Sequence, residues 1–222
     1  MDLSPFWLSI RLSITVTAIL LLLGLPLAWW LARTRSPARA FVEAVVALPL
    51  VLPPTVLGFY LLLLLGPKGP LGPLLEALDL RLVFSFPGLV VGSVIYSLPF
   101  VVNPLKNTFR EIPEGQLESA ATLGAGPLDR FLRVVLPLSA SGAVTAAVMG
   151  FAHTLGEFGV VLMIGGNIPG ETQVVSIAIY DHVEQLEYAE AHVYSAGLLV
   201  FSMVVLVLLY SSGRARRQAR FR

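Results

Sequence analysis

Residues 12–32 read LSITVTAILLLLGLPLAWWLA, an apolar stretch without Asp, Glu, Lys or Arg. A helix needs about 20 mostly apolar residues to cross the hydrocarbon core of a bilayer, because every backbone N–H and C=O must be paired within the segment. Asp2 rather than a basic cluster precedes the stretch, and no clear small-residue cleavage site follows it. The stretch is therefore predicted to be a retained span and not a signal peptide.

Four further stretches of similar length and composition follow. We therefore predict an all-α integral membrane protein that forms a single transmembrane domain over residues 1–222. Five transmembrane helices are expected, together with a cytoplasmic loop of its own helical design at 106–134 and a short external helix that is re-entrant or interfacial. The five predicted spans cover residues 9–32, 43–66, 83–105, 135–163 and 191–212.

The composition agrees with this fold class. The chain has 222 residues, of which 56% are hydrophobic and only 13% are charged, and its mean hydropathy is +0.80. A soluble domain carries about 25% charged residues, so an ordinary globular enzyme is excluded. The absence of cysteine excludes disulfides and thiolate-bound metals, no metal site is expected, and a net charge of +1 gives no indication of a nucleic-acid partner.

Basic residues indicate the orientation, because cytoplasmic loops are enriched in Lys and Arg. Twelve of the 15 basic residues lie in the turn after the first span, in loop 106–134 and in the C-terminal tail. These are Arg33, Arg35, Arg39, Lys106, Arg110, Arg130, Arg133, Arg214, Arg216, Arg217, Arg220 and Arg222. The N-terminus is predicted to lie outside and the C-terminus in the cytoplasm, which requires an odd number of spans. Residues 172–180 are too short to add a sixth.

The second span contains Pro49, Pro53 and Pro54 and is predicted to be kinked or partly unwound. Backbone N–H and C=O groups that are freed by a kink at membrane depth are tolerated only where neighbouring helices or a water-filled cavity supply their hydrogen bonds. A structural kink and a kink that lines a transport pathway are equally compatible with these residues.

Loop 106–134 carries signals for two short helices. Pro113 suits the first position of one helix, and Gly124 suits the residue just past its end. Pro127 then restarts a second helix, in which Leu128, Phe131, Leu132 and Val135 recur at the spacing of a single apolar face. The pair is predicted to form a knob that either lies against lipid headgroups or docks to a soluble partner.

Residues 118–124 read ESAATLG, and residues 134–137, nine residues further on, read VVLP. This pattern resembles the EAA coupling signature of ABC-importer permeases, with Ser119 in place of the first Ala and Val134 in place of Ile. The resemblance implies that the loop inserts into a cytoplasmic ATPase and transmits its closure to the spans. The implied coupling residues are Glu118, Ser119, Ala120, Gly124, Leu136 and Pro137.

Residues 48–54 (LPLVLPP), 155–159 (LGEFG) and 166–172 (GNIPGET) narrow the resemblance to the molybdate permease family. The implied function is that of an ABC-importer permease for molybdate in the cell (inner) membrane, with tungstate unresolved. The resemblance also implies a second copy of the chain, a cytoplasmic ATPase dimer and an external substrate-binding protein as partners. The alternatives are a sulfate, thiosulfate or other ABC importer and, from another class, an ATP-independent channel or secondary transporter.

The chain contains no Gly-x-x-x-x-Gly-Lys-Ser/Thr phosphate loop, so ATP and Mg²⁺ are expected on the partner ATPase, and this chain is expected to hold no cofactor and no catalytic residue. Intramembrane polar and hinge residues are the remaining site candidates. A carboxylate near the middle of a span is costly unless it is paired, and His153 is a possible partner for Glu157. The candidate gate or pathway residues are Glu157, Gly156, Gly159, Asn103, Ser13 and Thr17.

Overall fold

The computed structural model describes residues 2–219 and the side chains up to Val207. Of the tail arginines used to predict the orientation, Arg220 and Arg222 lie outside the described residues, as do the side chains of Arg214, Arg216 and Arg217. Residues 2–219 form helices and connecting segments, with no strand among them, which confirms the all-α prediction. The elements are α1 (Ser4–Arg33), α2 (Ala38–Val51), α3 (Pro54–Leu65), α4 (Gly72–Ala77), α5 (Phe86–Arg110), α6 (Glu114–Thr122), α7 (Pro127–Arg130), the π-helix η1 (Phe131–Val135), α8 (Leu136–Leu138), α9 (Ala140–Leu155), α10 (Gly159–Gly165), α11 (Val175–Glu184) and α12 (Tyr188–Ala219).

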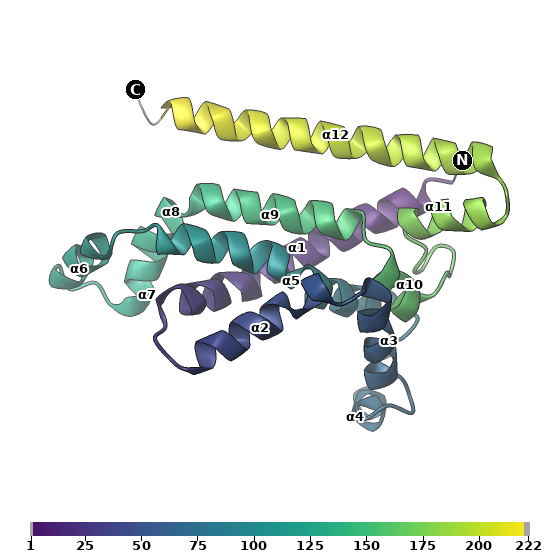
Figure 1. Ribbon diagram of the computed structural model, residues 1–222, viewed down its shortest axis with the longest axis horizontal. Helices are drawn as coiled ribbons and strands as arrows, with labels where there is room; N and C mark the ends of the chain where they lie inside the picture. The colour runs from purple at the N-terminus through teal and green to yellow at the C-terminus, as the bar shows by residue number, and fades with distance from the viewer. Residues whose placement is uncertain (1, 220–222) are drawn as a thin grey trace.

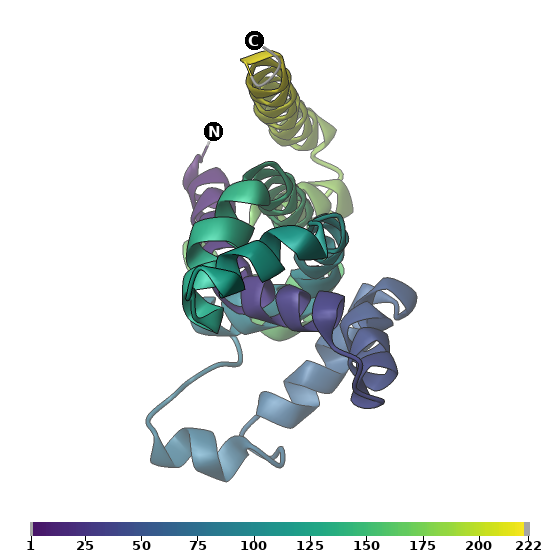
Figure 2. The same ribbon diagram turned by 90° about the vertical axis from the view of Figure 1, so that its left-hand side faces the viewer.

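Helices α1, α5 and α9 form the central bundle of an elongated molecule (Figures 1 and 2). Its core consists of fully buried aliphatic side chains such as Val16 and Leu20 of α1 and Val101 of α5. Helix α9 approaches α5 closely because residue 150 is glycine: a Cβ there would lie 2.6 Å from Cγ2 of Val101. Small residues at such crossings permit close backbone packing, which is a common basis of helix association in membranes.

Among the described residues, three helices are long and apolar enough to cross a membrane: α1, α5 and α12 over residues 188–207. Two bent pairs also pass the same test, so the described chain supplies up to five spans. In the first pair, α2 and α3 are bent by 113° at Leu52–Pro53, which confirms the kink predicted from the prolines of the second span.

The fourth predicted span is more irregular than its sequence suggests. A bend of 75° at Ser139 separates residues 127–138 from α9, and α9 ends at Leu155, before α10 begins at Gly159. The predicted fourth span, 135–163, therefore contains a bend near one end and a break near the other.

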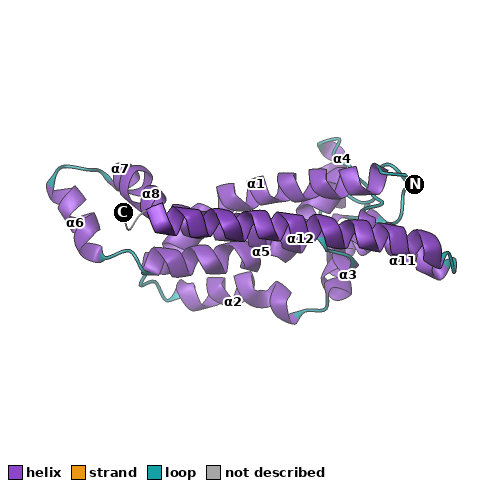
Figure 3. Ribbon diagram, turned by 90° about the horizontal axis from the view of Figure 1, so that it is seen from above, coloured by secondary structure: helices purple, strands orange, loops and turns teal. Residues whose placement is uncertain are grey.

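The two ends of the molecule differ in structure. Helices α6 to α8 lie at the same end as the C-terminal part of α12, whereas the N-terminus, α10 and α11 lie at the other (Figure 1). Seen from above, α12 runs along the bundle over α1 and α5 (Figure 3). The helix predicted around residues 172–180 is α11, which buries Val175, Ile177 and Ala178.

Candidate functional site

The predicted coupling loop begins with α6, whose end is defined by glycine. The N–H of Gly124 donates to the carbonyl of Ala121, and the N–H of Ala125 donates to the carbonyl of Ala120, both at 3.0 Å. This is the Schellman pattern of helix termination, and Gly124 has the positive φ (87°) that it requires. No atom lies within 4 Å of a Cβ built on Gly124, so the backbone conformation alone demands glycine here.

The loop presents three of its leucines to the outside. None of the residues of α6 is buried, and the coupling candidates Glu118 and Ser119 are exposed. Leu123 is 87% exposed, Leu128 70% and Leu132 50%. A knob with this much uncovered apolar surface fits a docking element for a partner.

The predicted single apolar face of the second loop helix is wrong. Val135 is fully buried, whereas Leu128 and Leu132 are exposed, because residues 131–135 form a π-helix in which the N–H of Leu136 bonds to the carbonyl of Phe131. Pro137, one residue further on, lacks the N–H that an α-helix would need, and the wider turn precedes it. The chain then bends at Ser139, two residues beyond Pro137.

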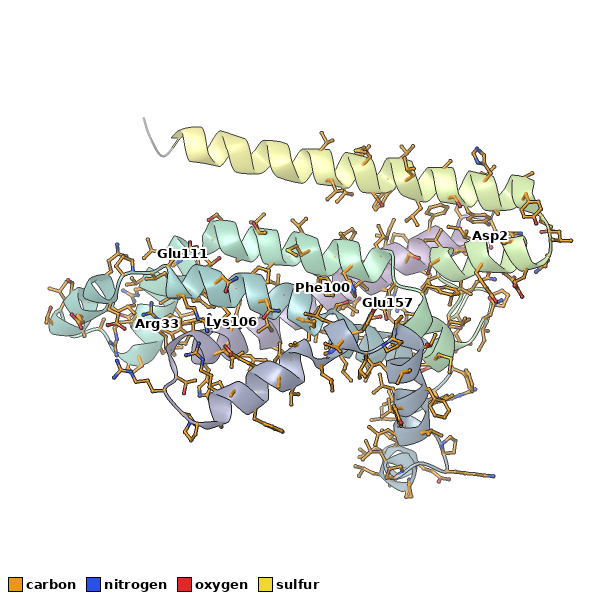
Figure 4. All side chains as sticks on the ribbon, in the orientation of Figure 1. Asp2, Arg33, Phe100, Lys106, Glu111 and Glu157 are labelled. Atoms are coloured by element: carbon orange, nitrogen blue, oxygen red, sulfur yellow. The ribbon has the colours of Figure 1, made fainter. Side chains whose placement is uncertain are left out.

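An arginine at the end of α1 fixes the start of the loop, an arrangement that no sequence motif indicates. Nη2 of Arg33 donates to the carbonyls of Phe109 (3.0 Å) and Ile112 (2.7 Å). Its guanidinium also lies 5.1 Å from the ring centroid of Trp29 and 3.7 Å from the carboxylate of Glu114. We call this set, Trp29, Arg33, Phe109, Ile112 and Glu114, the arginine clamp; Arg33 is labelled in Figure 4.

The aromatic part of the clamp reaches the second half of the loop. The ring of Trp29 meets Phe109 edge-on at 5.5 Å and lies 5.8 Å from the ring of Phe131 in η1. The clamp therefore connects α1, the C-terminal end of α5 and both halves of the coupling loop.

The two broken spans meet at their breaks. A Cβ on Gly159, at the start of α10, would lie 2.9 Å from Cβ and Cγ of Pro54, at the start of α3. Further along the same pair of helices, a Cβ on Gly58 would lie 2.7 Å from Cβ of Met163. Helices α3 and α10 thus form one closely packed unit, and Gly156 and Gly159 flank the break that leads into it.

Glu157 lies at this break, between the end of α9 at Leu155 and the start of α10 at Gly159, and is labelled in Figure 4. Its side chain is 4% exposed, and neither carboxyl oxygen has a hydrogen-bond partner among the described residues. The partnership with His153 is absent: Nδ1 of His153 is 2.9 Å from Oγ of Ser97, which is also 3.0 Å from Oγ1 of Thr154. The hydroxyl of Ser176 in α11 donates to the backbone carbonyl of Glu157 at 2.5 Å.

The other pathway candidates are less distinctive. The hydroxyls of Ser13 and Thr17 donate to carbonyls of their own helix, those of Ser9 and Ser13. Ser9 accepts a hydrogen bond from the N–H of Val175 at 2.8 Å and so fixes the start of α11. Asn103 lies in α5 and is partly buried.

The segment 166–173, between α10 and α11, is a compact loop. The buried hydroxyl of Thr172 donates to the carbonyl of Gly165 (2.7 Å) and accepts from the N–H of Ile168 (3.1 Å). The amide of Gln173 donates to Oδ1 of Asn167 at 2.8 Å. These bonds hold an exposed tip, residues 169–171, at the end of the molecule opposite to α6.

Comparison with known proteins identifies the chain's relatives. A family model described as "Binding-protein-dependent transport system inner membrane component" matches residues 24–218. The "Molybdenum transport system permease protein ModB" of Azotobacter vinelandii is 59% identical over 96% of this chain and 95% of its own length. A "Probable sulfate transport system permease protein cysT" of Zygnema circumcarinatum is 34% identical over 84% of this chain and 65% of its own length.

Among solved structures, the fold is similar to that of the MetNI methionine ABC transporter in inward-facing conformations. The TM-score is 0.73, with 95% of this chain and 94% of the other covered. The sequence identity is 18%, so this likeness concerns the fold.

Proposed function

Because this chain belongs to the family of inner membrane components of binding-protein-dependent transport systems, we propose that it is the permease subunit of an ABC importer for molybdate. Molybdate is proposed as the cargo because the chain is 59% identical, over nearly the full length of both chains, to a molybdenum transport permease. The 34% identity to a sulfate permease makes sulfate the alternative to be tested.

We infer the partners from the family and from the exposed ends of the molecule. The whole chain acts as one permease domain, two copies enclose the pathway about a two-fold axis, and lipid surrounds them. A cytoplasmic ATPase dimer docks on α6 and its exposed leucines, and an external binding protein delivers the anion at the opposite end, near loop 166–173. The ATPase binds ATP and Mg²⁺, and this chain supplies no catalytic residue.

In this proposal the coupling loop transmits closure of the ATPase to the spans. Movement of α6 passes through the Gly124 turn, α7 and η1 to the bend at Ser139, and from there along α9 to the break at Gly156. The unit of α3 and α10 lies directly beyond that break. A shift between two packings at the break would change the population of inward-open and outward-open states, which is how a ligand-driven switch operates.

Reconstitution tests the proposal. We expect liposomes that contain this chain, its ATPase and its binding protein to accumulate molybdate only when ATP is supplied, with sulfate as a weak competitor. Accumulation by this chain alone, driven by an ion gradient, would instead identify a secondary transporter. Preferential uptake of sulfate would show that the cargo is sulfate and not molybdate, and would leave the proposed coupling mechanism unchanged.

The orientation can be tested directly because the chain contains no cysteine. We expect a single cysteine at Asp2 to react with an impermeant maleimide in intact cells or spheroplasts. A single cysteine at Ser119 should react only after the membrane is permeabilised. The reverse pattern would place the coupling loop outside and contradict the proposed mechanism.

A further inference from the structure

Three cationic side chains converge on one carboxylate oxygen at the loop end of α2 and α5. Oε1 of Glu43 lies 3.4 Å from Nε of Arg39, 3.2 Å from Nζ of Lys106 and 3.1 Å from Nη2 of Arg110. We call these four residues the cation cluster. Lys106 is labelled in Figure 4, between α5 and α2.

The charge of the cation cluster is unbalanced. Three positive groups face one negative group, and all three lie close to one another because they surround the same oxygen. Their side chains are only partly exposed: 15% for Lys106, 34% for Arg39 and 41% for Arg110. Partial burial lowers the effective dielectric constant and increases the repulsion among like charges. The cluster therefore carries two positive charges for which the described residues at this place supply no counter-charge.

The geometry of the donors matches an oxyanion. Guanidinium and ammonium groups form short, strong hydrogen bonds with carboxylate and phosphate-type oxygens. In the structure, a carboxylate oxygen of the chain itself occupies the point at which the three donors meet. Glu43 thus acts as an internal substitute for an anion, and any oxyanion that binds here must compete with it.

We propose that the cation cluster is a binding site for a divalent tetrahedral oxyanion, which Arg39, Lys106 and Arg110 hold when the carboxylate of Glu43 withdraws. The proposal rests on the proposed function, because the site would receive the transported anion at the cytoplasmic end of the pathway. A lipid phosphate offers the same chemistry, and the experiment separates the two sources.

The test is equilibrium binding of radiolabelled molybdate to the permease–ATPase complex in phosphatidylcholine nanodiscs, without the binding protein. Glu43→Gln removes the competing charge and keeps all three cations, so we expect tighter binding than in the wild type, by roughly tenfold. Lys106→Gln removes one donor and should weaken binding by a similar factor, roughly tenfold. Arg35→Gln is the matched control, since it removes a positive charge from the segment between α1 and α2, outside the cation cluster, and Arg35 is exposed.

If the wild type, Glu43→Gln, Lys106→Gln and Arg35→Gln bind molybdate with the same affinity, the cation cluster is not the binding site. If Glu43→Gln fails to assemble, Glu43→Asp replaces it, because the shorter side chain draws the carboxylate away from the donors. To test a lipid as the source of the anion, phosphatidylglycerol is added to the nanodiscs. If the Glu43→Gln variant retains this lipid and binds no molybdate, the ligand of the site is a lipid phosphate, and the proposal that it binds the transported anion is wrong. Uptake by the wild-type importer is measured in parallel, so that failure of molybdate transport itself is recognised as failure of the proposed function.

Discussion

Removal of the Arg33 side chain should uncouple ATP hydrolysis from transport. Arg33→Ala deletes two hydrogen bonds from a cation to the carbonyls of Phe109 and Ile112, each worth about 1.5–3 kcal/mol. The cation–π contact with Trp29 adds about 0.5–1 kcal/mol. The pair with Glu114 adds little, because that carboxylate is 74% exposed and 3.7 Å away. Because Arg33 is partly exposed, we use the lower figure for each contact. The interactions that attach the loop to α1 are then weakened by about 3–4 kcal/mol in Arg33→Ala.

Only part of this loss should appear in global stability, since both freed carbonyls lie near the end of the bundle and can bind water. We expect the free energy of unfolding to fall by about 1–2 kcal/mol, with a fall in Tm of a few degrees. The larger effect should be mechanical: the number of molybdate ions imported per ATP hydrolysed should fall several-fold in liposomes, while basal ATPase activity is kept. Arg33→Lys should have a transport ratio between those of the wild type and Arg33→Ala, because an ammonium group keeps the positive charge but lacks the planar set of N–H donors of a guanidinium.

The control for this experiment is Arg35→Ala. It also removes one positive charge, but at an exposed position two residues beyond Arg33. It should leave the transport ratio unchanged. If Arg33→Ala imports molybdate at the wild-type ratio, the clamp does not transmit motion between α1 and the loop.

Three further outcomes are expected. Glu118→Lys, on the exposed face of α6, should reduce ATP-driven uptake at least tenfold, while membrane fractionation shows the usual amount of inserted protein. Gly58→Ala places a Cβ 2.7 Å from Cβ of Met163 and should destabilise the permease by about 1–3 kcal/mol in thermal melts, whereas Gly115→Ala, with open space around it, should not. Thr172→Val removes both side-chain hydrogen bonds of Thr172 within loop 166–173, so hydrogen exchange at the amide of Ile168 should accelerate.

The sequence predicted those features that depend on local rules. Apolar length pointed to segments of which three are candidate spans, or up to five with the two bent pairs, Pro53 and Pro54 located the bend in the second predicted span, and Gly124 located the end of α6. Each of these follows from the requirements of a single residue or of one continuous segment. The same locality explains why the resemblance of residues 118–124 to the EAA signature led to the correct family.

Features that depend on distant pairing could not be predicted in this way. Arg33 meets Ile112, 79 residues away, and Glu43 meets Arg110, 67 residues away; no spacing rule connects these positions. The apolar face of residues 128–135 was mispredicted for a related reason, since the helical period changes to a π turn before Pro137. A pattern read at 3.6 residues per turn cannot detect such a change.

The juxtaposition of the two breaks gives the candidate gate its physical basis. A break in one span can bend in any direction that its neighbours permit, but Gly159 holds the start of α10 against Pro54 at the start of α3. The segments beyond the two breaks are packed against each other, so in the proposed mechanism the coupling loop needs to act on only one of them, through α9. Glu157 lies buried at this common hinge with both carboxyl oxygens unpaired among the described residues. An unpaired buried polar group is costly, and the hydroxyl of Ser93 is also buried without a partner among the described residues, so the proposed movement at this break would be stabilised by any packing that gives Glu157 a donor.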